Sequence, residues 1–189
     1  MTPEAKVKGV AFKTIELCFT ELRGQAARAR VDEHLPAELA EGFRYRTILA
    51  TNWYSIELYK ACFRAFRAAT GEGADLAREI GKLAARHDMA GVHKQILAKL
   101  ISPQALVGMS QRVFNTYYDT GSFAIEESRR GFIRAKCTGC VGFDENMWSE
   151  VAGSCESLLE IAGAKFIRLR IVSGGGDHSD AAEMEARWA

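Results

Sequence analysis

The feature that most constrains the fold of this chain is a change in its hydrophobic period near Gly121. Before this glycine, apolar residues recur every three or four positions, as one face of an α-helix requires; Val7, Cys18 and Leu22 belong to the first such row. After it, apolar and polar residues alternate, as they do in a half-buried β-strand. A chain with helices first and strands later is expected to form an α+β domain.

Several helices are predicted before Gly121. The first covers 7–22, and a short second helix begins with Pro36, because proline is tolerated in the first helical turn. Asn52 is predicted to cap the next helix, which ends before Gly71. Further helices are predicted over 74–86, 89–100 and 103–117.

The last third of the chain predicts strands around one helix. Strands are predicted around 123–125 and over 132–137, 165–172 and 183–188, and a helix over 147–162 separates the two pairs. The expected fold is a helical N-terminal layer, 1–120, packed on a four-stranded antiparallel sheet with the chain order β-β-α-β-β, 121–189. We expect 1–189 to form a single domain of this kind.

The charge balance excludes several classes of partner. The chain has 25 Lys and Arg against 24 Asp and Glu, which gives a net charge of +1 and no bulk attraction to nucleic acid or to an anionic membrane surface. No apolar run approaches the ~20 residues of a membrane-spanning helix, and no apolar signal-peptide core follows Met1. We therefore expect a cytoplasmic protein with no nucleic-acid partner and no membrane insertion.

The five cysteines do not predict a disulfide framework, because their number is odd and their spacing is wide. Cys18 and Cys62 lie in apolar helical rows and are interpreted as small buried hydrophobic residues. Cys137 and Cys140 form a single C-x-x-C pair, which makes them candidates for a metal or redox site with Cys155 as a third ligand. The alternative is a structural role at the end of a strand.

The sequence contains none of the G-x-S-x-G, G-x-G-x-x-G or P-loop motifs, so we do not expect an enzyme. Aromatic side chains gather instead near the predicted helix–sheet junctions, where they suit a mostly apolar ligand pocket. The candidate ligand-binding residues are Trp53, Tyr59, Phe63, Phe114, Tyr117, Tyr118 and Trp148. The alternative is that these side chains fill the core.

The C-terminal third also has the pattern of a known group of domains. Tyr-Tyr-Asp-Thr-Gly at 117–121 precedes a hairpin, Leu-Leu-Glu-Ile-Ala-Gly-Ala at 158–164 ends a helix, and a last hairpin closes on Trp188. On these residues, with 7–10 and 78–81, the chain resembles an uncharacterised domain found in many myxobacterial paralogues. More distantly it resembles the haem nitric-oxide/oxygen-binding (H-NOX) domains and the four-vinyl reductase and TRAPP-like ligand-binding domains. The resemblance implies a bacterial protein with an H-NOX-like fold and a role in ligand sensing.

The resemblance also implies a haem site, and the chain departs from the H-NOX pattern there. An H-NOX domain holds the haem iron through a histidine on the helix before the first strands of the sheet, but the corresponding residues, 103–118, include no histidine. The residues 117–119 do not reproduce the Tyr-x-Ser-x-Arg clamp for the haem propionates, and His93 lies one predicted helix too early. We therefore expect a domain without haem and without another cofactor.

Together these features predict a small-molecule-binding sensory or regulatory domain that takes a small apolar or neutral ligand and signals through a protein partner. The alternative is a scaffold or interaction module that acts as a homodimer without a small ligand. The small residues of 61–69 suit close contact between helices, and Arg23, Arg28 and Arg30 suit an acidic partner.

Overall fold

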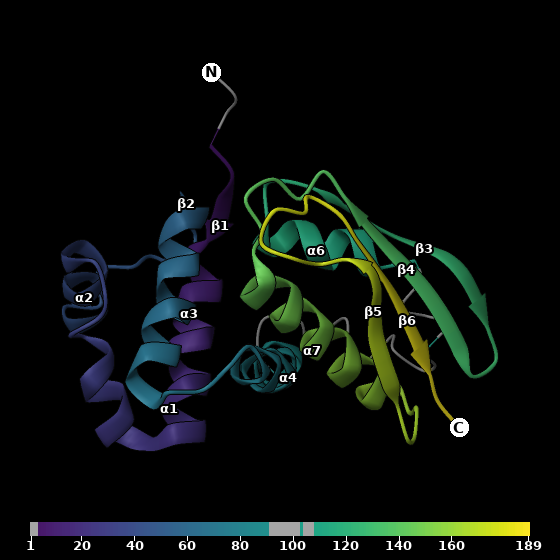
Figure 1. The fold of residues 1–189 in the computed structure, drawn as a ribbon, viewed down its shortest axis with the longest axis horizontal. Helices are drawn as coiled ribbons and strands as arrows, with labels where there is room; N and C mark the ends of the chain where they lie inside the picture. Colours follow the sequence, from purple (N-terminus) through teal and green to yellow (C-terminus); the bar gives the residue numbers. More distant parts are fainter. Residues whose placement is uncertain (1–3, 91–102, 104–107) are drawn as a thin grey trace.

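The computed structural model describes residues 4–90, 103 and 108–189 (Figure 1). Its elements are β1 (Lys6–Lys8), α1 (Gly9–Val31), α2 (Ala37–Arg44), β2 (Trp53–Ser55), α3 (Ile56–Thr70), α4 (Asp75–Ala90), α6 (Ser110–Tyr117), β3 (Ser122–Arg129), β4 (Phe132–Thr138), α7 (Glu145–Ile161), β5 (Arg168–Gly174) and β6 (Ala182–Arg187). The predicted α+β class, with helices first and a β-β-α-β-β unit after them, is confirmed. Of the helix predicted over 89–100, residues 89–90 end α4 and the rest lies outside the described residues.

The predicted start of the chain is wrong in one respect, because a short antiparallel pair of strands, β1 and β2, precedes and interrupts the helices. Val7 pairs with Tyr54 in this ladder, so the first helix begins at Gly9 rather than at Val7. The same pairing keeps 53–55 extended and prevents Asn52 from capping α3. The cap is Ser55, whose hydroxyl accepts a hydrogen bond of 3.2 Å from the backbone N–H of Glu57.

The second sheet has the strand order β3-β4-β6-β5, and all of its neighbouring strands are antiparallel. Ala135 pairs with Met184, and Met184 with Ile171, so these side chains share the face that points to the helices. Arg134, one residue away from Ala135, points to the opposite, solvent-facing side, where its guanidinium meets Glu185 at 2.6 Å. Figure 1 shows α6 and α7 beside the inner face of this sheet. α4 lies on the side of α7 that faces away from the sheet, and α1 and α3 lie farther from the sheet.

Two glycines allow α4 and α7 to approach each other at backbone distance. A Cβ added to Gly81 would lie 2.1 Å from the carbonyl oxygen of Glu150, and a Cβ added to Gly153 would lie 2.1 Å from that of Arg78. The hydroxyl of Ser154 donates across the same contact to the carbonyl oxygen of Gly81, at 3.1 Å. This contact fixes the position of α7 and therefore the direction of every side chain that α7 presents to the sheet.

Some of the residues that favoured a homodimer or an acidic partner make contacts inside the fold. Ala61, Ala65 and Ala69 of α3 are buried in the core, so these small residues are not available for contact with a second copy. Arg23 binds Glu72 at 2.6 Å and Glu79 at 2.8 Å, which neutralises part of the basic surface expected there. No helix in the described part of the chain has the length and apolar character needed to cross a membrane.

Candidate functional site

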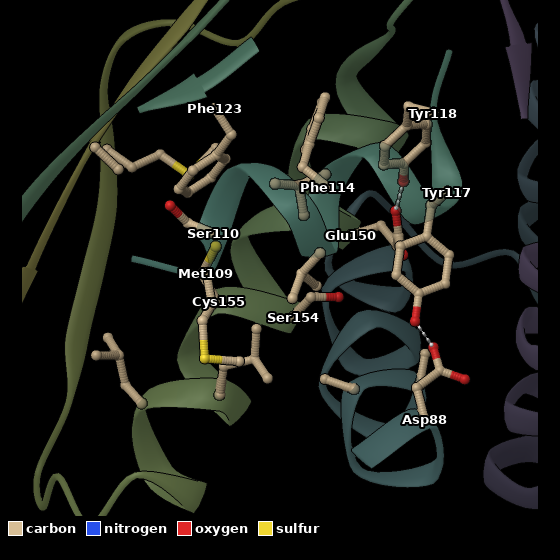
Figure 2. Close-up of a pocket in the computed structure, with 18 of the residues that line it drawn as sticks. Asp88, Met109, Ser110, Phe114, Tyr117, Tyr118, Phe123, Glu150, Ser154 and Cys155 are labelled. Atoms are coloured by element: carbon tan, nitrogen blue, oxygen red, sulfur yellow. Dashed lines mark hydrogen bonds between the residues drawn. The ribbon is translucent and has the colours of Figure 1, made fainter. Parts of the chain in front are cut away.

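A cavity of about 140 Å³ lies between the helices and the inner face of the larger sheet (Figure 2). Side chains from α1, α3, α4, α6, α7 and all four strands of that sheet line it. Its size is close to that of an engineered cavity of about 150 Å³ in another protein, which stays dry and binds benzene. A cavity of this size accommodates one small molecule.

Most of the cavity wall is apolar. The larger apolar side chains that line it are Ile15, Met89, Met109, Val113, Phe114, Phe123, Ile125, Ile133, Val151, Leu158, Leu159, Leu169 and Met184. Five alanines, at 11, 84, 85, 135 and 186, complete the apolar part of the wall. Such a wall favours the apolar body of a ligand and provides few groups to orient it.

The polar groups of the cavity are concentrated at the side that faces α1 and α4. The Tyr117 hydroxyl donates a hydrogen bond of 2.7 Å to Oδ2 of Asp88, and the Thr14 hydroxyl donates one of 3.2 Å to Oδ1. Figure 2 shows Tyr117 from α6 and Asp88 from α4 meeting beside the second acidic residue, Glu150. Asp88 and Tyr117 therefore form one hydrogen-bonded link between α6 and α4 at the edge of the cavity.

Glu150 of α7 is the second buried carboxyl group, with only 7% of its surface exposed. Its Oε2 accepts a hydrogen bond of 2.8 Å from the Tyr118 hydroxyl, which is drawn in Figure 2. Burial raises the pKa of Glu150 to about 7; the charge of Asp88 adds to this increase, whereas the hydrogen bond from Tyr118 opposes it. Near neutral pH this carboxyl group therefore exists in both its protonated and its ionised form.

Tyr59 of α3 is fully buried, and its hydroxyl has no hydrogen-bond partner among the residues that the structure describes. Its ring is held in place by edge contacts with Phe12, at 5.0 Å between ring centres, and with Phe63, at 5.4 Å. Burial raises the pKa of Tyr59 well above its usual value, and the charge of Glu150 is the next largest cause. The phenol is therefore a neutral hydrogen-bond donor close to Glu150.

The structure brings four of the seven predicted ligand-binding residues to this cavity, namely Tyr59, Phe114, Tyr117 and Tyr118. The other three lie elsewhere. Trp53 lies on β2, is 38% exposed and contacts the Lys8 ammonium group with its ring. Phe63 packs between Tyr59 and Phe66. Trp148 donates a hydrogen bond of 3.3 Å from Nε1 to the backbone oxygen of Ser179. A ligand-binding role for the four aromatic residues in the cavity stays a prediction.

Sequence reasoning missed the two carboxyl groups, Asp88 and Glu150, because acidic side chains are usually solvated. A signal was nevertheless present. Asp88 follows Ile80 and Ala84 at intervals of four, and Glu150 lies three positions after Met147 in the row that faces the core. An acidic residue inside an apolar helical row is a candidate for a buried polar site.

Cys137 and Cys140 lie together at the end of β4, and both are fully buried. The hydrogen bond between the two thiols and burial both raise the pKa of Cys137, whereas the same hydrogen bond lowers the pKa of Cys140. Within 4–90 and 108–189, no group of three or more His, Cys, Asp or Glu residues is arranged to hold a metal ion. Cys18 and Cys62 are buried, as predicted.

No family model and no curated protein matches the sequence. Solved structures do match the fold. A variant of the Fe(II) unliganded H-NOX protein from K. algicida superposes with a TM-score of 0.72 at 13% identity, covering 96% of each chain. The Fe(II)NO form of an H-NOX protein from S. oneidensis gives 0.73 at 12% identity, covering 96% of this chain and 99% of that one. The chain has the H-NOX fold.

An oxygen-binding H-NOX domain related to soluble guanylate cyclases gives a TM-score of 0.70 at 14% identity, covering 96% of this chain and 94% of that one. The resemblance expected from the sequence is therefore confirmed at the level of the fold. Because the sequence identity is so low, the shared fold does not assign the activities of these H-NOX proteins to this chain.

The described residues of the cavity do not fit haem. None of those that line it is His, Lys or Arg, so neither a histidine for the iron nor a cation for the propionates is found among them. Burial raises the pKa of the Cys155 thiol to about 12 and raises that of Tyr118 well above its usual value.

We expect the purified protein to show no Soret band, even when it is expressed with an excess of haem precursor, because haem would lack an axial ligand and cationic partners. An absorption spectrum of the full chain measures this directly. His93 lies outside the described residues. A Soret band that disappears in a His93→Ala variant would contradict the expectation and identify the iron ligand.

Proposed function

We propose that this protein is a haem-free sensory or regulatory domain that binds a small, uncharged and largely apolar molecule in its internal cavity and signals through a protein partner. The observation that carries the proposal is the cavity of about 140 Å³, which lies between the helices and the sheet and is bordered by the buried groups of Glu150, Tyr118 and Tyr59. A core that served packing alone would be filled by side chains, because protein interiors are close-packed.

The chemistry of the wall favours a neutral ligand. No cationic side chain is found among the described residues that line it, so a carboxylate or phosphate ligand would meet Glu150 without a compensating charge. The apolar side chains provide the driving force for binding, since they remain partly in contact with water or empty space until a ligand arrives.

The outer face of the larger sheet supports the part of the proposal that concerns a partner. Three arginines, Arg168, Arg170 and Arg187, and one acidic residue, Glu185, border a hollow there. Arg168 lies directly opposite Arg187 across the β5–β6 ladder. Like charges in this position are unfavourable, and neither Arg168 nor Arg170 forms an ion pair within the described part of the chain. These charges keep the free edge of β5 from pairing with other strands, and they favour an acidic protein surface.

A cavity-filling substitution gives the proposal a sharp test. Ala135 is buried on the inner face of β4 and lines the cavity, so the added side chain of Ala135→Leu would occupy the space available to a ligand. We expect some one-ring compounds to raise the melting temperature of the wild-type protein by roughly 5–10 °C at about 100 times their Kd, and to leave Ala135→Leu unchanged.

Differential scanning fluorimetry with a library of one-ring compounds measures this shift, and native mass spectrometry of freshly purified protein detects a ligand carried from the cell. Ala186→Val, a smaller change in the same wall, serves if Ala135→Leu fails to fold. The proposal is wrong if no compound stabilises the wild type more than the filled variants and the native mass is that of the bare chain.

A further inference from the structure

We propose that Tyr59 and Glu150 select a ligand that carries a hydroxyl group on a small apolar body, with the Tyr59 hydroxyl donating to the ligand oxygen and the ligand hydroxyl meeting the Glu150 carboxyl group. This inference rests on the proposed function, since it names the class of molecule that the cavity takes. The polar pair comes from two different helices, α3 and α7, and both side chains line the same cavity.

The first observation is the hydroxyl of Tyr59, which is buried without a hydrogen-bond partner in the described residues. Buried polar groups are nearly always paired, because water is lost and nothing replaces it. The ring of Tyr59 cannot easily turn away, since it is fixed between Phe12 and Phe63. An acceptor atom from a ligand would complete the hydrogen bonding at this position.

The second observation is the unequal use of the Glu150 carboxyl group. Tyr118 donates to Oε2, whereas no hydrogen bond is made to Oε1 by any side chain or backbone group of the described residues. Glu150, Tyr118 and Tyr59 all line the same cavity. The carboxyl group therefore has an oxygen available to a ligand in the cavity that the unpartnered phenol also lines.

A hydroxyl group matches this pair better than other small polar groups. It accepts from Tyr59 and at the same time donates to Glu150 when the carboxyl group is ionised, or accepts from it when it is protonated. A ketone only accepts hydrogen bonds, so it leaves the ionised Glu150 carboxylate without a donor. An ammonium group only donates, so it leaves the Tyr59 hydroxyl without an acceptor. A carboxylate ligand would place a second negative charge beside Glu150 in a site of low dielectric constant.

The size of the cavity limits the apolar body to about one six-membered ring, by comparison with the engineered benzene-binding cavity of similar volume. Four probes with the same ring test the class: cyclohexanol, cyclohexane, cyclohexylamine and cyclohexanecarboxylate. The affinity of each is measured by ligand-observed NMR titration of the full-length wild-type protein and of Tyr59→Phe.

We expect Tyr59→Phe to weaken the binding of cyclohexanol about tenfold and to change that of cyclohexane by less than roughly twofold, because only the alcohol uses the phenol. Cyclohexanecarboxylate is expected not to bind. Tyr45→Phe, which changes the exposed tyrosine at the end of α2 in the same way, is the matched control and should alter no affinity. The melting temperature of ligand-free Tyr59→Phe should equal or exceed that of the wild type, which shows that the variant folds.

The outcomes separate this inference from the proposed function. One outcome keeps the proposed function and overturns this inference. In that outcome, cyclohexane binds to the wild type but not to Ala135→Leu, and Tyr59→Phe weakens the binding of the alcohol and of the hydrocarbon equally. The cavity then binds ligands, but Tyr59 does not select them. Stronger binding of cyclohexylamine than of cyclohexanol would assign the site to cations and also overturn the inference. If no probe binds to the wild type, the proposed function itself fails for ligands of this size.

Discussion

Replacing Gly153 by alanine is expected to destabilise the protein by about 3 kcal/mol or more, one of the largest effects of any single methyl group in this fold. The new Cβ would lie 2.1 Å from the carbonyl oxygen of Arg78, which is backbone and cannot turn aside. The two helices must therefore separate by more than an ångström. Alanine favours a helix over glycine by about 1 kcal/mol, which offsets only part of this cost.

Urea unfolding of Gly153→Ala, and of the reciprocal variant Gly81→Ala, measures the loss of free energy. Gly73→Ala is the matched control, because no atom lies within 4 Å of a Cβ at that position, and its stability should stay within about 0.5 kcal/mol of the wild type. A Gly153→Ala protein as stable as Gly73→Ala would show that α4 and α7 do not meet at backbone distance. It would also remove the basis for the position of Glu150, which α7 presents to the cavity.

Glu150→Gln is expected to become progressively more stable than the wild type between about pH 5 and about pH 8, with a total change of about 3 kcal/mol. The pKa of Glu150 is raised from 4.5 to about 7 in the folded protein. Between these two values the folded state binds a proton that the unfolded state has lost, so the contribution of Glu150 to stability falls as the pH rises. Glutamine keeps the acceptor for Tyr118 and does not titrate.

The measurement is the difference in unfolding free energy between Glu150→Gln and the wild type at several pH values across this range. Glu33→Gln, which changes an exposed glutamate in the same way, is the matched control. A constant difference for Glu150→Gln would mean that the carboxyl group is solvated and that no buried polar site exists at this end of the cavity. Asp88, which contributes to the raised pKa, is unchanged in all of these proteins.

The change of hydrophobic period predicted the layers of the fold because it reports which faces are buried. The predicted helix stops at Gly71 and Gly163 are confirmed for the same local reason, since both adopt a positive φ that glycine tolerates. The pairing of β1 with β2 was not predictable, because three residues are too few to show an alternating pattern. Its existence depends on contact between segments about 45 residues apart in the chain.

The candidate site was predicted in part. Tyr59 and Phe63 lie one turn apart on α3, and only the packing of that helix decides that Tyr59 reaches the cavity whereas Phe63 stays in the core. Glu150 and Asp88 were missed because the energetic cost of burying a carboxyl group makes solvent the usual expectation. Their burial follows from the close approach of α4 and α7, which is a property of the assembled helices.

The most direct test of a ligand site in the cavity uses the methionines as reporters. Three of the five, Met89, Met109 and Met184, line the cavity, whereas Met147 is buried outside it. In protein labelled with ¹³C at the methionine methyl groups, bound cyclohexanol should give intermolecular NOEs to the three cavity methyls and none to Met147. NOEs that avoid all three cavity methyls, or no NOE from a ligand shown to bind, would contradict the account.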